Sequence, residues 1–140
     1  MQGVTFGEKH SYWDWGLILK EHPIVSPPEP KKKIVEIPAA DGHIDLSEAL
    51  TGKIHYQCRE ITCRFTMPGQ RERWPLLYSD MLNYLHGKRL EIRLDNDLDY
   101  FYTGRVEISE WEPGENVAEV TILATVAPYK TAYADGKEVL

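Results

Sequence analysis

One segment of this chain has the apolar spacing of an amphipathic helix, and the sequence on both sides of it has the patterns of strands. Between residues 73 and 86 the apolar side chains recur at steps of three and four, which places them along one helical face. Pro75 lies in the first turn, where its missing amide costs nothing, and Gly87 suits the left-handed position just past a helix end. We therefore predict a helix at about 73–86 whose core face comprises Trp74, Leu77, Tyr78, Met81, Leu82 and Leu85.

The remaining patterned sequence predicts a mainly β fold. Several segments alternate apolar and polar residues, the period of a strand with one buried face. Short stretches rich in Asp, Asn, Gly and Pro connect the last three of these segments, as in antiparallel hairpins. A meander packed against the helix, together with a second sheet, would make a β-sandwich. The predicted strands are residues 4–19, 55–67, 89–94, 100–111 and 117–126.

Aromatic residues are prominent in two of these strands. In the first strand the buried face is predicted to carry Trp13, Trp15, Leu17 and Leu19. In the fourth, Tyr100, Phe101 and Tyr102 are consecutive, so at least one ring must point to each side of the sheet. Because monomers seldom expose a large apolar patch, we expect the outer ring to be buried against another chain.

Prolines separate the first strand from a hairpin that should protrude from the body. Residues 22–30 contain four prolines, which remove backbone donors and predict an extended connector. Residues 34–38 then have the pattern of a strand, Asp41-Gly42 that of a turn, and Ile44 and Leu46 that of a second strand. Residues 47–52 predict a compact loop or a single helical turn closed by Gly52.

The length is typical of one domain that can bury a hydrophobic core without the help of disulfides or metal ions. We assign residues 1–130 to this domain and its arm. Residues 131–140 show little periodicity and are expected to form a loose tail, or an arm that orders on a partner.

The chain carries 22 acidic and 16 basic residues, a formal net charge of -6, which disfavours sequence-independent nucleic-acid binding. The one basic run, Lys31-Lys32-Lys33, is either a solvated linker face or a contact to something acidic. Residues 1–6 lack the basic and apolar segments of a secretory signal peptide, and no apolar run is long enough to span a bilayer. We therefore expect cytoplasmic synthesis without membrane insertion.

The sequence offers no catalytic, cofactor-binding or metal-binding constellation. Asp95, Asp97 and Asp99 begin like a calcium loop, but Tyr100 and Val106 stand where that loop requires glycine and glutamate, so we expect hairpin-tip acids facing water. The nearest pair of metal-ligand type, His43 and Asp45, is expected to be solvated.

Cys58 and Cys63 are five residues apart in one strand, too far to bond and without zinc spacing, so we expect free, half-buried thiols. No enzyme activity and no cofactor are predicted.

Short motifs in a consistent order resemble the N-terminal domain of the distal tail proteins of long-tailed bacteriophages and prophages. They are His10-Ser11-Tyr12, Asp14-Trp15-Gly16-Leu17-Ile18-Leu19, Ile37-Pro38, Asp41-Gly42, Asp45-Leu46-Ser47-Glu48-Ala49-Leu50-Thr51-Gly52, Tyr102-Thr103-Gly104-Arg105-Val106 and Ala127-Pro128-Tyr129-Lys130. Ala39-Ala40 departs from the pattern, because relatives have a glycine and a basic residue before Asp41-Gly42. Many relatives also continue into a second domain for host binding, a role not carried over here.

The resemblance implies a structural protein that forms a hexameric ring at the distal end of the tail tube. Its partners would be its own copies, the tube, and the tip or baseplate proteins, with DNA only as passing cargo. It would be assembled in the bacterial host cytoplasm and reside in the virion tail. The arm would clasp the neighbouring subunit through Ile34, Val35, Ile37, Ile44 and Leu46. An alternative is a carbohydrate- or receptor-binding module at the tail tip, in which aromatic rings stack on sugars.

Overall fold

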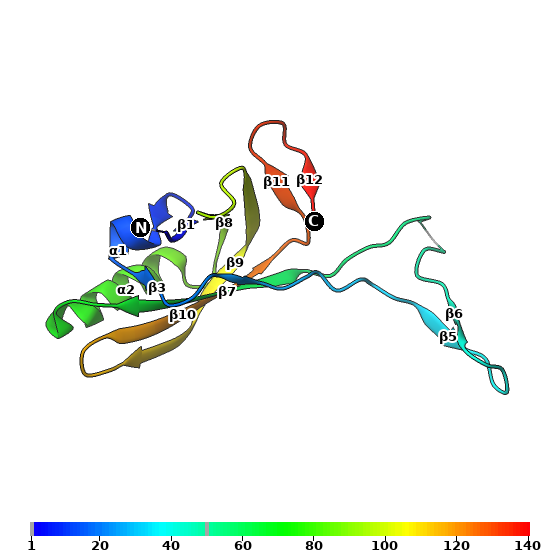
Figure 1. Cartoon of the computed structure of the whole chain (residues 1–140), viewed down its shortest axis with the longest axis horizontal. Helices are drawn as coiled ribbons and strands as arrows, with labels where there is room; N and C mark the ends of the chain where they lie inside the picture. The colour runs from blue at the N-terminus through cyan, green and yellow to red at the C-terminus, as the bar shows by residue number, and fades with distance from the viewer. Residues whose placement is uncertain (1, 50) are drawn as a thin grey trace.

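The computed structural model describes residues 2–49 and 51–140, which form a mainly β body with a long projecting arm (Figure 1). The predictions that involve Met1 and Leu50, the amino-terminal residue and one position of the loop at 47–52, lie outside the described residues. Among the described residues, no helix is both long and apolar enough to cross a bilayer.

One antiparallel sheet of ten strands makes the body, and its main path runs β2-β1-β8-β9-β10-β7-β3. β4 also pairs with β7, while β11 pairs with both β9 and β12. The sheet is strongly curled into a half-barrel (Figure 1). Its strands are β1 (Val4–Phe6), β2 (Lys9–His10), β3 (Ile18–Leu19), β4 (Ile24–Val25), β7 (Arg59–Met67), β8 (Lys88–Leu94), β9 (Tyr100–Pro113), β10 (Ala118–Val126), β11 (Lys130–Ala132) and β12 (Glu138–Val139).

The mainly β prediction is confirmed, but the prediction of a sandwich is wrong, because the described body strands form one sheet. Gly104 lets β9 approach β10 closely, since a Cβ at this position would lie 2.1 Å from the Thr125 carbonyl oxygen. A register shift between Thr121 and Ile122 adds a bulge, which bends and twists the strand pair. The curled sheet wraps its own core.

The predicted helix is confirmed with nearly its predicted bounds. A 3-10 turn, η1 (Arg71–Arg73), runs directly into α2 (Trp74–Leu85), and Gly87 follows with φ 77°. α2 packs against β8 and β9, where the Tyr78 ring stacks on Trp111 at 4.4 Å between centroids. Trp74, Met81 and Leu85 are buried, and Leu77, Tyr78 and Leu82 are half-buried against the core.

The amino-terminal segment is not the single strand predicted over residues 4–19. A short helix, α1 (Ser11–Trp15), interrupts it. The cause is local: the His10 ring nitrogen Nδ1 accepts the amides of Tyr12 and Trp13 and caps the helix. The helix turns Trp13 outward, 72% exposed, while Trp15 and Leu17 are buried and Leu19 is half-buried.

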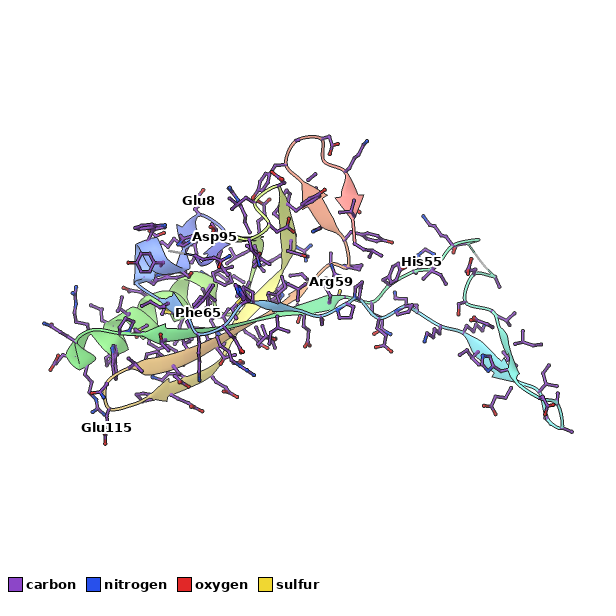
Figure 2. The ribbon with its side chains drawn as sticks, viewed as in Figure 1. Glu8, His55, Arg59, Phe65, Asp95 and Glu115 are labelled. Carbon is purple, nitrogen blue, oxygen red and sulfur yellow. The ribbon has the colours of Figure 1, made fainter. Side chains whose placement is uncertain are left out.

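Alternation along β7 and β10 supplies much of the core, including Phe65 near the centre of the body (Figure 2). Cys58 and Cys63 are free, as predicted, but neither is half-buried: Cys58 is exposed and Cys63 is fully buried. Burial raises the pKa of Cys63 to about 12.

The carboxyl-terminal segment, expected to be a loose tail or a partner-dependent arm, forms the β11–β12 hairpin. β11 pairs with the start of β9, and the Tyr133 ring lies 4.7 Å from the Phe101 ring. Tyr102 is buried on the other side of β9. The chain's own hairpin therefore covers Phe101, where the sequence predicted burial against another chain.

Candidate functional site: the projecting arm

The predicted hairpin exists and extends away from the body as the arm (Figure 1). Its strands, β5 (Ile34–Glu36) and β6 (His43–Asp45), pair antiparallel with Val35 opposite Ile44. Between arm and body the two chain segments run side by side: the Lys31 amide donates to the His55 carbonyl at 2.7 Å, and the Gln57 amide donates to the Glu29 carbonyl at 2.8 Å. The proline-rich connector is thus one half of an extended two-stranded stalk.

Arg59 fixes the base of the stalk to the body (Figure 2). Its Nε donates to the Ser26 carbonyl at 3.1 Å, and its guanidinium lies 5.9 Å above the Tyr102 ring. Ser26 in turn exchanges hydrogen bonds with the backbone of Glu60. The connector is therefore tied to β7 just before the prolines, which have no amides to donate.

The arm exposes apolar side chains and has no core beneath them. The register places Val35 and Ile44 on one face, and strand alternation places Leu46 on the same face. An isolated two-stranded hairpin is at best marginally stable in water. The five predicted interface residues are 38–46% exposed: Ile34, Val35, Ile37, Ile44 and Leu46. The arm is therefore the part of the molecule that would gain most from burial against a partner.

The tip of the arm turns through a strained alanine. The Ala40 amide donates to the Ile37 carbonyl at 3.3 Å, and Ala39 has φ 62°. Proline at the second turn position and a left-handed residue at the third define a type II turn, whose third position favours glycine. Ala39 is one of the two positions where the sequence departs from the resembling family, and the turn forms there despite the missing glycine.

Ser47 closes the end of the hairpin nearer the body, a role that the sequence pattern did not reveal. Its hydroxyl accepts the Lys33 amide at 2.9 Å, and its amide donates to Asp45 Oδ1 at 2.9 Å. The Ser47 hydroxyl also donates to Asp45 Oδ1, and the two hydrogen bonds that Ser47 donates hold the pKa of Asp45 below its usual value. Asp45 is thus engaged in a local turn, and both Asp45 and His43 are exposed, as predicted.

Two of the three acids considered for a calcium loop, Asp95 and Asp97, instead bond to other segments of the chain. The expectation that all three face water is therefore wrong. Asp95 Oδ2 accepts the Gly3 amide at 2.8 Å and lies 2.8 Å from His10 Nε2. Asp97 binds Lys130 Nζ at 2.7 Å, and this bond raises the pKa of Lys130. Only Asp99 is exposed. Within residues 2–49 and 51–140, no three His, Cys, Asp or Glu side chains gather into a potential metal site.

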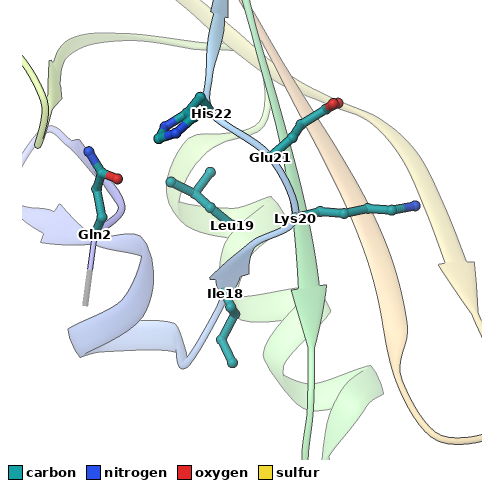
Figure 3. A pocket seen from close by; sticks show the side chains of 6 residues that line it. All are labelled: Gln2, Ile18, Leu19, Lys20, Glu21 and His22. Atoms are coloured by element: carbon teal, nitrogen blue, oxygen red, sulfur yellow. The ribbon is translucent and has the colours of Figure 1, made fainter.

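A shallow, open groove beside β3 is lined by Gln2, Ile18, Leu19, Lys20, Glu21 and His22 (Figure 3). Lys20 and Glu21 point away from Gln2 and His22, toward the outer face of the sheet. There Lys20 pairs with Glu119 at 3.0 Å and Glu21 with Arg64 at 2.8 Å. The two charges in this groove are therefore used in ion pairs across the sheet.

The structure was compared with known proteins. No protein-family description and no curated protein matches the sequence. Among solved structures, the Dit protein (gp 19.1) of SPP1 superposes with a TM-score of 0.75 and covers 94% of this chain. The chain has the fold of the N-terminal half of SPP1 Dit.

That structure is described as a paradigm of the hub adsorption apparatus in phages that infect Gram-positive bacteria. The two sequences are 16% identical, and the match spans 52% of Dit, its N-terminal domain. The resemblance seen in the sequence is therefore confirmed as a structural match.

Proposed function

We propose that this chain is a Dit-like structural component of a phage or prophage tail, and that its copies join into a ring through the arm. The observation that carries the proposal is the superposition on Dit over 94% of the chain, combined with an arm whose apolar side chains have no core. The role is one of assembly, without catalysis or a cofactor.

The position of the arm suits a ring. An arm that leaves one side of the subunit and buries its apolar face on a different surface of the next copy makes a head-to-tail contact. Such contacts close into a ring when the rotation between copies divides a full turn. Six copies, as the resemblance implies, would have a mass of about 97 kDa, six times 16.2 kDa.

In the virion this ring would stand at the distal end of the tail tube and link it to the tip or baseplate, with DNA passing through. Assembly would take place in the bacterial cytoplasm. Residues 1–130 would supply the ring-forming unit, and residues 131–140 would complete the hairpin that covers Phe101.

The arm can be removed with little disturbance of its base. Lys33 and Ser47 are joined by a hydrogen bond of 2.9 Å, so two glycines can replace residues 34–46. Light scattering after gel filtration should give about 97 kDa for the intact chain and a monomer for the deletion variant. Circular dichroism should show the same cooperative melting of the body in both proteins.

Val35→Ser with Ile44→Ser should also give a monomer, because the change removes the central apolar pair of the arm. Leu76→Ser, at an exposed apolar position of α2, is the matched control and should leave the ring intact. An arm-deleted protein that still forms rings, or an intact chain that stays monomeric at every concentration, would contradict assembly through the arm.

A further inference from the structure

A groove with basic side chains lies at the root of the arm, and we call it the root groove. Three consecutive lysines and His55 contribute basic groups to its lining, and Leu46 and Ala49 contribute apolar side chains. The volume is about 290 Å³. The lining residues are Lys31, Lys32, Lys33, Leu46, Ser47, Ala49, Thr51 and His55.

The lysines of the root groove form no ion pair within the described part of the chain. None of the ion pairs formed there includes Lys31, Lys32 or Lys33. His55 is bonded to the Thr51 hydroxyl and not to a carboxylate. The groove thus presents lysines outside any ion pair beside apolar side chains, on a chain whose net charge is -6, and Asp45 lies close enough for Lys32 to lower its pKa.

The hairpin between β9 and β10 presents the opposite charge, and we call its end the acidic tip. From residue 106 to residue 129 the sequence contains five glutamates and neither lysine nor arginine. Glu112 and Glu119 are directly opposite each other in the strand register. Like charges at such positions destabilise a strand pair, so the arrangement favours a cation from elsewhere.

One of these acids is already neutralised and the others are not. Lys20 pairs with Glu119, whereas Glu110, Glu112 and Glu115 take part in no ion pair formed by the described residues. Val117 stands among them with 38% of its surface exposed. Val117 is thus an exposed apolar residue flanked by carboxylates that form no ion pair. The root groove has the complementary composition, because its lining combines apolar side chains with lysines that form no ion pair.

The two surfaces cannot meet within one chain. Glu115 marks one end of the molecule, and His55 lies toward the other, along the arm (Figure 2). A head-to-tail arrangement of copies brings such opposite ends together at every junction.

We propose that the root groove of each copy receives the acidic tip of the next copy, with Lys31–Lys33 facing Glu112 and Glu115 and with Val117 seated against Leu46 and Ala49. The inference rests on the proposed assembly of copies and adds a second, electrostatic contact to the apolar arm. Because complementary charges steer encounter and fix register, this contact orients the neighbour before the arm closes on it. It should weaken with salt, unlike the burial of the arm.

Charge reversal on either surface tests the contact. The root variant carries Lys32→Glu and Lys33→Glu, and the tip variant carries Glu112→Lys and Glu115→Lys. Each variant alone places like charges at every junction and should weaken self-association by about tenfold or more. An equimolar mixture should associate again, because root variant and tip variant alternate with opposite charges at each junction. A chain with all four changes should also recover.

Lys9→Glu with Lys137→Glu is the matched control for the root variant, since it makes the same change in net charge at two exposed positions outside the root groove and the acidic tip. In the wild-type protein, carbodiimide should join Lys31–Lys33 to Glu112 or Glu115. A mixture of isotope-labelled and unlabelled copies should show by mass spectrometry that these links join different chains.

Unchanged association of the root and tip variants would overturn the proposal while leaving assembly through the arm intact. So would intermolecular links that never join the root groove to the acidic tip. A wild-type chain that neither associates nor cross-links would overturn both this inference and the proposed ring. Root-variant effects confined to binding of a DNA oligonucleotide would assign the groove to phosphates and also refute the contact.

Discussion

Replacing Gly104 by alanine should destabilise the whole body, because a methyl group has no space at this position. Gly104 pairs with Leu90 of β8 and with Val126 of β10, so it lies inside the curled sheet. A Cβ built there lies 2.1 Å from the Thr125 carbonyl oxygen and 2.5 Å from the Val126 Cα. Ordinary carbon–oxygen contacts between strands are about 3.3–3.6 Å, so β9 and β10 would have to separate by roughly 1 Å.

The size of the stability loss depends on whether the atoms that obstruct the new methyl group can move away. Overpacking of a core costs about 1–3 kcal/mol, and we expect the upper end because the obstacle is backbone in a hydrogen-bonded ladder and cannot rotate away. Unfolding entropy is about 2.1 cal/mol/K per residue, or about 0.3 kcal/mol/K for a chain of this length. A loss of about 3 kcal/mol should therefore lower Tm by about 10 °C.

Thermal melting followed by circular dichroism, with urea unfolding as a second measure, tests this expectation. Thr125→Ala is the matched control, since it removes an exposed side chain but keeps the carbonyl that obstructs alanine at position 104. It should cost less than about 1 kcal/mol. A Gly104→Ala protein that melts within 2 °C of wild type would refute the argument that close strand approach at Gly104 curls the sheet.

Two further predictions concern strain and burial. Ala39→Gly should relieve about 1 kcal/mol of left-handed strain at the arm tip, so amide hydrogen exchange in the arm should slow by about fivefold, and faster exchange would refute the turn assignment. At pH 8 a thiol reagent should modify Cys58 rapidly and Cys63 only after unfolding. Burial raises the pKa of Cys63 from 9.0 to about 12, so the folded state holds this proton more tightly and stability should fall as pH rises from 9 toward 12. Cys63→Val should show a smaller fall than wild type, and equal falls would refute the assignment.

Local signals in the sequence predicted the helix, the alternating strands and the arm. Pro75 lies in the first turn of α2 and Gly87 lies just past its end, and each influences only the backbone within about one turn. The arm was predictable because prolines exclude its connector from both helix and central strand. In each case the information lies within a few residues of the structure that it determines.

The errors arose where distant residues or side-chain bonds decide the structure. A strand pattern over residues 4–19 gave no sign that His10 would cap a helix with its ring nitrogen. The single curled sheet depends on the approach of Gly104 to Thr125, which are neighbours only after folding. The root groove joins Lys31–Lys33 to a loop more than ten residues later, so the sequence alone left the lysine run with two interpretations.

The stalk of the arm has a mechanical consequence. Residues 53–58 lead directly into β7, so the arm and the longest strand near that edge of the sheet's path, next to β3, belong to one continuous length of chain (Figure 1). β7 is paired along its whole length with β10 and is held on its other edge by β3 and β4. A pull on the arm along the direction of β7 loads these ladders in shear, so their hydrogen bonds share the force instead of opening one at a time. A force applied to the arm is therefore transmitted along β7 to the strands that pair with it.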